Sequence, residues 1–382
     1  MAESPPQAEV RPPDMPDAGL KQPPTEATAA TVRPGEAQRT DSLARRLVSM
    51  LSFRNVSALY IYLVMFAVFS IWVPDTFLQW DMWKALISSQ AVTAIVAIGL
   101  AIGLSAGAFD LAIGAELGFG AILVAYLLVE QDISVAPAIA LTLLVGALIG
   151  AVNGLLIVKV RIESFIATLG VSSILLAMIA WVSSSQQILD LPEGFREIGV
   201  ATIFGLTLPV YLMLVVAVLG WYVLERTPLG RRIYATGGNI EAARLAGVKV
   251  SAVIVGSLVA CAAIATFAGL LVSANLGTGD PTVGPAYLLP AFSAVFLGST
   301  QFRGGRFNVW GTVVAVYVLA TGVKGLQLAG APIWIPNLFN GAALLVAVGL
   351  AKYEGTARRA GAVRKLLRFD RRDSTAGRVE NR

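Results

Sequence analysis

The sequence contains no histidine and a single cysteine, Cys261. These absences exclude zinc sites of histidine or paired cysteines, Ser–His and Cys–His nucleophile systems, and structural disulfides. Cys261 lies in the apolar run 254–271, where we expect an inert packing residue. No Gly-x-x-x-x-Gly-Lys-Ser/Thr phosphate loop occurs either, so ATP is not bound by that route. No metal and no cofactor are predicted, and an enzyme is disfavoured.

Charge is also scarce. Charged residues make up 14% of the chain and hydrophobic residues 56%, whereas a soluble domain carries about 25% charged residues. Between Val56 and Ala351 the sequence repeats apolar runs long enough to cross about 30 Å of hydrocarbon. In lipid such runs have to be helices, because the backbone must satisfy its own hydrogen bonds. The fold class predicted is all-α, a polytopic transmembrane helix bundle.

About ten spans are expected. They cover residues 56–73, 85–105, 111–129, 135–158, 165–183, 207–224, 251–274, 286–300, 308–327 and 334–352, the eighth being short and containing Pro290. With the N-terminus in the cytoplasm, the inner loops hold nine Lys and Arg residues, whereas the outer loops hold Lys84 and Arg196, with Lys324 near an outer helix end. This bias toward positive inner loops predicts that both termini are cytoplasmic.

The two ends of the chain differ from this core. Residues 1–50 begin with a proline-rich stretch that has no apolar run, which predicts a disordered cytoplasmic tail rather than a signal peptide. Residues 51–355 form the predicted transmembrane domain, and residues 356–382 a basic cytoplasmic tail. The net charge of +5 fits bundle orientation better than nucleic-acid binding, so no nucleic-acid partner is expected and membrane lipid is.

The longest cytoplasmic loop, residues 225–250, contains the signals of a short helix. Gly237-Gly238 permits a sharp turn, and Asn239 is a good N-cap for a helix that starts at Ile240. Glu241 suits the positive helix end, and Gly247 can stop the helix. A helix of about two turns is too short to be stable alone in water, so it needs a surface to dock on.

This loop, Leu229-Gly-Arg…Ala235-Thr-Gly-Gly-Asn…Glu241-Ala-Ala-Arg-Leu-Ala-Gly247, resembles the coupling loop of permease subunits of bacterial ABC importers of the ribose, xylose, arabinose and galactose type. That family is related to the branched-chain amino acid and nucleoside permeases. Three more stretches match in order: Gly107-Ala-Phe-Asp-Leu-Ala-Ile-Gly114; Asn153-Gly154 with Phe165-Ile-Ala-Thr-Leu-Gly170; and Asp280-Pro-Thr-Val-Gly284…Tyr287 with Leu297-Gly-Ser-Thr and Gly304-Gly305.

The resemblance implies a transport subunit of the cell inner membrane, moving a monosaccharide or related polyol by alternating access. Its implied partners are a separate ATPase subunit, a second permease subunit in a homo- or heterodimer, and a periplasmic substrate-binding protein docked on the outer loops 184–206 and 275–285. The residues implied in ATPase coupling are Gly237, Gly238, Asn239, Glu241, Ala242, Ala243, Arg244 and Gly247.

Two ionisable residues, Asp110 and Glu116, fall inside the membrane. A charge at the centre of a span costs roughly 2.5–3.5 kcal/mol, so each needs an explanation. Asp110 follows the break between two spans, where it can cap the next helix, contact substrate, or take part in a gating or partner contact. Glu116 is expected to face the bundle interior, either paired to a polar neighbour or lining the pathway.

Further candidates for the translocation pathway or its gating, besides Asp110 and Glu116, are Gly114, Asn153 and Thr168. Hydroxyl and amide groups suit a hydroxylated ligand, and they equally suit hydrogen bonds between helices. Small residues also recur every four positions, at Gly99, Gly103 and Gly107 and again at Gly146, Gly150 and Gly154. Both series predict helix faces that a neighbouring backbone can approach closely.

Competing functions remain open at this point. Within ABC transport, the substrate can instead be a nucleoside or a branched-chain amino acid. A secondary transporter would use the intramembrane carboxylates as proton or sodium sites. A structural scaffold would leave the glycine-lined faces and the capped loop helix without a purpose.

Overall fold

The computed structural model describes residues 57–301 and 305–349, and helices make up most of both ranges. The predicted tails, 1–50 and 356–382, lie outside the described residues. Ten helices occupy the positions of the predicted spans. They are α2 (Ser57–Trp72), α4 (Trp80–Ser105), α5 (Ile113–Val129), α6 (Val135–Leu155) continued by the π-helix η2 (Leu156–Val160), α7 (Ser164–Val182), α9 (Leu208–Arg226), α12 (Val250–Leu276), α13 (Pro285–Gln301), α14 (Val309–Leu328) and a last apolar helix, Ile335–Gly349.

Six of these helices in the described part of the chain are long and apolar enough to cross a membrane: α4, α6 with η2, α7, α9, α12 and α14. The other four are apolar but shorter. The structure is therefore mostly helical, as predicted, with six helices that could cross a membrane by length and composition; the number of about ten spans stays a prediction.

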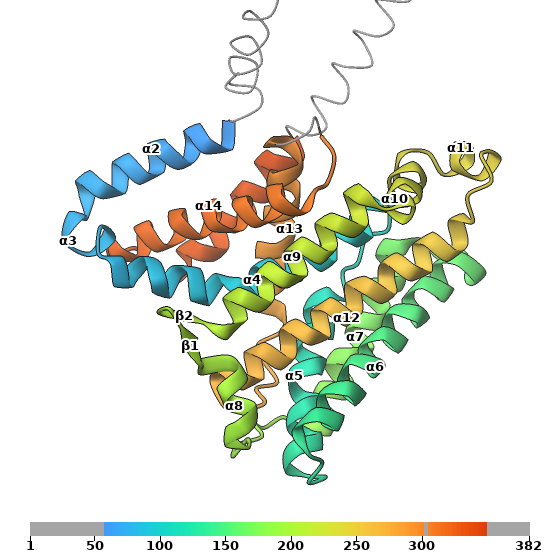
Figure 1. The fold of residues 1–382 in the computed structure, drawn as a ribbon, viewed down its shortest axis with the longest axis horizontal. Coiled ribbons are helices and arrows are strands. Elements are labelled where there is room, and N and C mark those ends of the chain that lie inside the picture. The colour runs from blue at the N-terminus through green and yellow to red at the C-terminus, as the bar shows by residue number, and fades with distance from the viewer. Residues whose placement is uncertain (1–56, 302–304, 350–382) are drawn as a thin grey trace, which may run out of the picture. The chain divides into compact units, whose positions relative to one another are not determined.

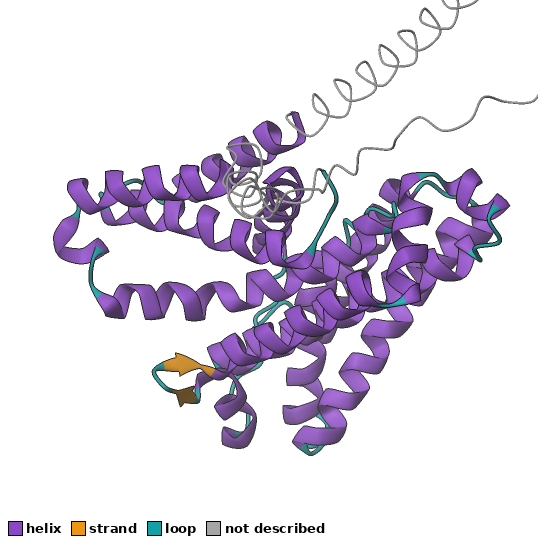
Figure 2. Ribbon diagram, turned by 45° about the horizontal axis from the view of Figure 1, so that its top comes forward, coloured by secondary structure: helices purple, strands orange, loops and turns teal. Residues whose placement is uncertain are grey.

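Several short elements were not predicted. They are α3 (Pro74–Phe77), α8 (Glu193–Val200), α10 (Pro228–Gly238) and a small hairpin of β1 (Thr202–Ile203) and β2 (Leu206–Thr207), which Figure 2 shows beside the helices. The hairpin turns at Phe204 and Gly205, whose φ angles of 50° and 80° suit a tight two-residue connection.

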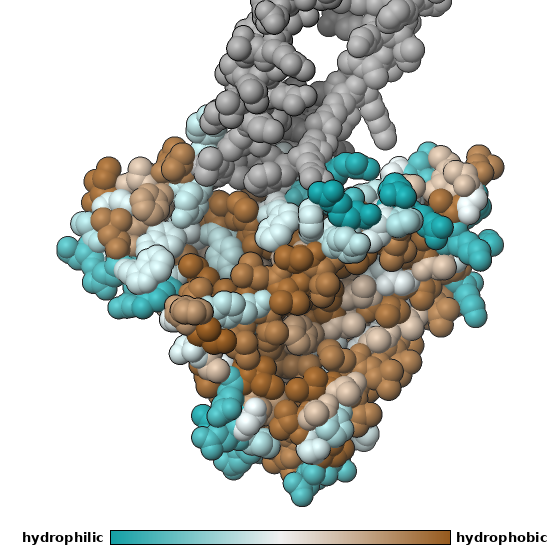
Figure 3. Space-filling model, in the orientation of Figure 1, coloured by the Kyte–Doolittle hydropathy of each residue, from teal (hydrophilic) through white to brown (hydrophobic). Residues whose placement is uncertain are grey.

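The helix α4 lies at the centre of the described bundle. Within its most apolar window 72% of the residues are buried, against 22% for α6 and 28% for α7. A helix that is apolar all round belongs in an interior or a membrane, and α4 packs against α12, α14, α9 and α13. The outer helices present apolar side chains such as Leu148, Ile166 and Trp181. Figure 3 shows one broad hydrophobic face, bounded by hydrophilic residues near α10 and α11 (Ile240–Leu245) and near α8.

The helix α12 connects two ends of this bundle. Its 27 residues make a rod of about 40 Å at 1.5 Å per residue. α11 (Ile240–Leu245) lies next to its first residues, and α8 packs near its last ones (Figure 1). α12 also packs along α5 and α6, so it contacts both ends and the middle of the molecule.

Candidate functional site

The short helix α11 has the cap expected from the sequence. Asn239 is extended, with φ −158°, and its Oδ1 accepts a hydrogen bond from the Ala242 amide over 3.0 Å. Glu241 in the first turn pairs with Arg244 over 3.1 Å. Gly247 follows the helix with φ +79°, a conformation that glycine adopts without a steric penalty. The predicted start, first-turn charge and stop of this helix are all present.

Most of α11 is exposed. Ala243 alone among its six residues is buried, at 3% exposure, and Leu245 is 90% exposed. A six-residue helix with an exposed leucine gains little from its own chain, since short helices depend on packing for stability. Its exposed side chains, Ile240 and Leu245 among them, make no packing contact that buries them within the described residues.

The two glycines before α11 act differently from the prediction. Gly237 and Gly238 are the last residues of α10 and do not form the turn, which the extended backbone of Asn239 makes instead. Gly237 packs against the end of α4, where a Cβ would overlap the Ser105 carbonyl and lie 3.0 Å from the Gly107 amide nitrogen. Gly238 has no neighbour within 4 Å of such a Cβ. The first glycine is required by a close contact between elements, and the second is not.

The segment 107–114 lies beside the start of α7. The Leu111 amide donates to Thr168 Oγ1 over 3.0 Å, and the Ala112 amide donates to Asp110 Oδ1 over 3.0 Å. Asp110 therefore bonds to the amide of Ala112, the residue before α5, and makes no side-chain cap on that helix, so the predicted capping is not seen. At the other end of the segment, a Cβ on Gly114 would lie 3.0 Å from the Gly284 carbonyl oxygen. Two stretches that carried the family resemblance thus pack against each other.

Glu116 pairs with Asn153, the first of the two arrangements considered for it. Asn153 Nδ2 donates to Glu116 Oε1 over 3.1 Å, and both side chains are fully buried between α5 and α6. Asp110 Oδ2, Glu116 Oε2 and Asn153 Oδ1 make no hydrogen bond within the described residues. The Cys261 thiol lies next to the Asp110 carboxylate, so this cysteine is buried beside a polar group as well as within apolar packing.

The second glycine series faces α12. A Cβ on Gly146 or Gly150 would overlap the side chain of Thr266 or the carbonyl of Leu258, and one on Gly154 would lie 2.7 Å from Val255 Cα. In the first series Gly99 meets α12, but Gly107 lies beyond the end of α4 with φ +81°. The backbone approach predicted for these faces is confirmed for the α6 series.

At the far end of α12 the two loops 184–206 and 275–285 form one surface, here called the platform. Gln187 Nε2 donates to Asp280 Oδ2 over 2.9 Å, and Ile188 and Gly279 exchange backbone hydrogen bonds of 2.9 and 2.8 Å. Asn275 Nδ2 donates to the Gly199 carbonyl in α8 over 3.2 Å. Segments far apart in the sequence are joined here.

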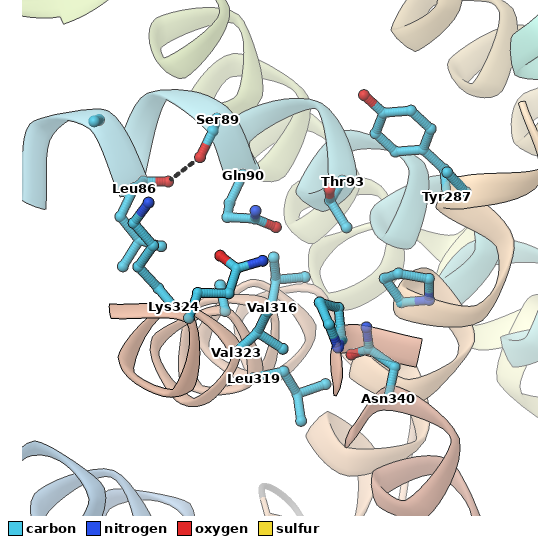
Figure 4. A pocket seen from close by; sticks show the side chains of 16 residues that line it. Leu86, Ser89, Gln90, Thr93, Tyr287, Val316, Leu319, Val323, Lys324 and Asn340 are labelled. Carbon is cyan, nitrogen blue, oxygen red and sulfur yellow. Dashed lines mark hydrogen bonds between the residues drawn. The ribbon is translucent and has the colours of Figure 1, made fainter. Parts of the chain in front are cut away.

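Next to the platform lies a cavity of about 430 Å³ between α4, α13, α14 and the last helix (Figure 4), here called the polar cavity after the seven polar residues among the sixteen that line it. Its polar lining consists of Ser89, Gln90, Thr93, Tyr287, Lys324, Gln327 and Asn340. A second cavity of about 540 Å³ shares Ala85, Ser89, Ala286 and Tyr287 with it and reaches Asn275 of the platform. The two cavities are therefore neighbours that share part of their lining, and the second lies between the platform and the first.

None of the predicted pathway residues lines either cavity. Asp110, Gly114, Glu116, Asn153 and Thr168 lie instead in the packing among α5, α6, α7 and α13. The residues that line the polar cavity were missed. The available signal was Ser89-Gln90 and Thr93 inside an otherwise apolar span, with Lys324 and Gln327 near the end of another.

These features define the class of the protein: a multi-pass helical membrane protein of the transport type, with a polar cavity between its helices and an exposed capped helix at one end. Within that class, the chain belongs to the family described as "Branched-chain amino acid transport system / permease component", whose model matches residues 83–348.

Three relatives show the range of similarity. The ribose import permease protein RbsC of Escherichia coli K12 is 33% identical over 312 residues, covering 80% of this chain and 95% of the relative. The L-arabinose ABC transporter permease protein AraH of Azospirillum brasilense is 30% identical over 300 residues, 78% of this chain and 88% of the relative. The autoinducer 2 import system permease protein LsrD of Photorhabdus luminescens is 30% identical over 260 residues, 66% of this chain and 78% of the relative. No solved structure matches the chain.

Proposed function

We propose that this protein is the transmembrane permease subunit of an ATP-driven importer that carries a monosaccharide or related polyol across the bacterial inner membrane. The observation that carries the proposal is the arrangement along α12. The exposed, capped α11 lies at one end, and the platform and polar cavity lie at the other. A force that a partner applies to α11 can therefore pass along α12 to the cavities that the solute would enter.

The proposed topology has ten spans with both termini in the cytoplasm. It is supported by the ten helices at the expected positions and by the concentration of Lys and Arg in the loops assigned to the inner side. In this topology α11 lies in the cytoplasm, and the platform with its acidic residues Asp190, Glu193, Glu197 and Asp280 lies outside.

Three protein partners follow from this topology. An ATPase subunit grips the coupling residues 237–247 on the inner side, and a substrate-binding protein docks on the platform. A second permease subunit, identical or homologous, completes the membrane part. Support comes from the exposed Leu245 and Ile240 on α11, from the joined loops of the platform, and from relatives whose names describe import permeases.

A hydroxylated solute suits the cavity better than a branched-chain amino acid does. Seven of the lining residues carry amide, hydroxyl or ammonium groups, which bind the hydroxyl groups of a sugar by hydrogen bonds. A branched-chain amino acid has no hydroxyl groups to pair with these side chains. The relatives named for ribose and arabinose agree with this preference.

The mechanism proposed is alternating access. ATP-driven closure of the partner moves α11 and α10, and Gly237 transmits the motion to the end of α4 and to Gly107. The packed cluster of Asp110, Gly114, Glu116, Asn153 and Thr168, which joins α5 to α6 and α7, acts as the gate. It moves as a unit with α5 and is held together by hydrogen bonds. The smooth glycine face of α6 allows α12 to tilt against it.

Co-purification from the native membrane, followed by reconstitution in vesicles, tests the proposal. We expect an ATPase and a binding protein to accompany the chain. Uptake of radiolabelled monosaccharides should then require ATP inside and the binding protein outside, and it should persist when the membrane potential is collapsed. Uptake by the purified chain without any ATPase, or its loss on collapse of the potential with ATP present, would favour secondary transport and overturn the proposal.

A further inference from the structure

The polar cavity has an unbalanced charge. Sixteen residues line it. Lys324 is charged, and no Asp, Glu or Arg contributes to the lining. Lys324 makes no ion pair and no hydrogen bond with the described residues. The other lysine at this end, Lys84, is neutralised by Asp81 over 2.7 Å at the start of α4 and lies outside the cavity.

Lys324 lies among other groups that are free to bind. The side chains of Gln90, Thr93, Tyr287 and Asn340 make no hydrogen bond within the described residues, although Thr93 is only 7% and Asn340 only 9% exposed. Figure 4 shows Gln90 pointing from α4 into the cavity, and Lys324 extending from α14 so that its amine lies beside Leu86 of α4. All four residues line the cavity, so their amide and hydroxyl groups are accessible to a ligand that enters it.

The alternative explanation, that Lys324 only extends to the membrane surface (snorkelling), fits the structure less well than a role in the cavity. A lysine near the end of a span often extends to the membrane surface, and Lys324 lies four residues before the last residue of α14. Its side chain is half-buried, however, and lines the cavity together with Leu86 and Ser89 of α4. An ammonium group in a cleft with low-dielectric walls attracts anions and repels cations.

We propose that the cavity takes a sugar acid, a polyhydroxylated ligand whose carboxylate is bound by Lys324. The amide and hydroxyl groups of Gln90, Thr93, Tyr287 and Asn340 bind its hydroxyl groups. The cavity volume of about 430 Å³ lies within the range of about 300–1,000 Å³ typical of small-molecule sites. This inference rests on the proposed function and names the substrate class of the same site.

Uptake by the reconstituted complex, with its ATPase and binding protein, tests the inference. The probes are D-glucuronate, D-galacturonate and D-gluconate, compared with neutral D-glucose, D-galactose and D-ribose. Lys324→Gln is expected to lower uptake of the acids at least tenfold and that of any neutral sugar less than twofold. Lys324→Arg keeps the charge and should restore acid uptake. Lys84→Gln removes a charge at the same end but outside the cavity, and should change neither.

Each other outcome has a definite meaning. Wild-type uptake confined to neutral sugars overturns the sugar-acid inference and leaves the proposed importer intact. Equal loss of acids and neutral sugars in Lys324→Gln also overturns it, because the lysine would then support the fold rather than select charge. Absence of ATP-dependent uptake for every probe in the wild type contradicts the proposed function itself.

Discussion

Gln187 donates a hydrogen bond to Asp280 over 2.9 Å and so joins two loops that lie 93 residues apart in the sequence. Asp280 also accepts from the Thr282 amide over 2.8 Å and from the Thr282 hydroxyl over 2.7 Å. One carboxylate therefore fixes the shape of its own loop and ties it to the loop that leads into α8. The platform proposed for the binding protein depends on this residue.

Asp280→Ala is expected to weaken docking of the binding protein about fivefold, because hydrogen bonds to a charged group that order the platform are lost, at a cost of about 1 kcal/mol. The measurement is the Kd of the co-purified binding protein for the permease complex in lipid nanodiscs. Glu130→Ala removes an acidic residue from a different loop at the same end and should leave the Kd unchanged. Equal weakening by both variants would indicate a general charge effect instead.

The same contact sets the pH range over which this first prediction holds. The Thr282 amide is the main cause that holds the pKa of the Asp280 carboxyl below its ordinary value of 3.8, and the Thr282 hydroxyl and Gln187 add to it. A lowered pKa in the folded chain means that the ionised form stabilises the loops. That stabilisation is complete above about pH 4 and is lost as the pH falls through the lowered pKa. Asp280 therefore stays ionised between pH 7 and pH 5. Any change in the Kd for docking over this range should be the same in the wild type and in Asp280→Asn.

The cap of α11 gives the second prediction. Asn239→Ala removes the acceptor for the Ala242 amide, which costs a helix about 1 kcal/mol. Because α11 is so short, the helix should fray, and ATP hydrolysis should no longer drive uptake while the membrane helices stay folded. The ratio of sugar imported to ATP hydrolysed measures this. Asn239→Ser retains a capping oxygen and should keep a ratio near the wild type; equal ratios in all three proteins would exclude the cap from coupling.

Gly237 and Gly238 form a matched pair for the third prediction. A methyl group on Gly237 would overlap the Ser105 carbonyl at the end of α4, whereas one on Gly238 meets nothing within 4 Å. Gly237→Ala should therefore lower stability by about 1–3 kcal/mol, as overpacking does, and should reduce uptake. Gly238→Ala should leave both unchanged. Thermal unfolding in detergent and ATP-dependent uptake are the measurements. If Gly237→Ala and Gly238→Ala gave the same stability and the same uptake, Gly237 would have no role in coupling.

The residues of α11 illustrate what the sequence can predict. The cap at Asn239, the charge at Glu241 and the stop at Gly247 are local, since each depends on neighbours a few residues away. The spans are predictable for a related reason, because about 20 apolar residues in a row leave a chain few alternatives. For such features sequence and structure agree closely.

The cavity illustrates what the sequence cannot predict. Gln90 and Thr93 are visible as polar residues in an apolar span, but so is Asn153, which bonds to Glu116 in a packed interface. Whether such a residue faces a cavity or a neighbouring helix depends on where α13 and α14 lie, far along the chain. The helices α8 and α10 were missed because, with 8 and 11 residues, they are too short to be recognised as spans; both are amphipathic, so the signal that could have found them was their apolar periodicity.

The pair Glu116 and Asn153 gives the fourth prediction. Glu116→Gln retains an oxygen that accepts from Asn153, so stability and uptake should stay near the wild type. Glu116→Ala leaves the buried Asn153 amide without a partner, which costs about 1–3 kcal/mol, and should lower both. Thermal unfolding and uptake are measured on the same preparations. Loss of uptake in Glu116→Gln with unchanged stability would show instead that the carboxyl group itself acts in the gate.

The glycine face of α6 gives the last prediction. A Cβ on Gly150 would overlap the Leu258 carbonyl and lie 2.7 Å from Val259 Cα, both in the backbone of α12. Because backbone atoms cannot rotate away as a side chain does, Gly150→Ala must push the two helices apart, at a cost of about 1–3 kcal/mol. If α12 tilts on this face during transport, uptake should fall even where the protein remains folded.

The glycine at position 170 supplies the control, since a Cβ there meets nothing within 4 Å on the exposed side of α7. Gly170→Ala should keep the unfolding temperature and the uptake of the wild type. ATPase activity of the complex separates two causes of a defect in Gly150→Ala. Hydrolysis that continues without uptake means that force still reaches α11 but no longer moves α12 against α6. Wild-type uptake in Gly150→Ala would show that this interface does not slide, and the motion of the gate would then have to arise between α4 and its neighbours.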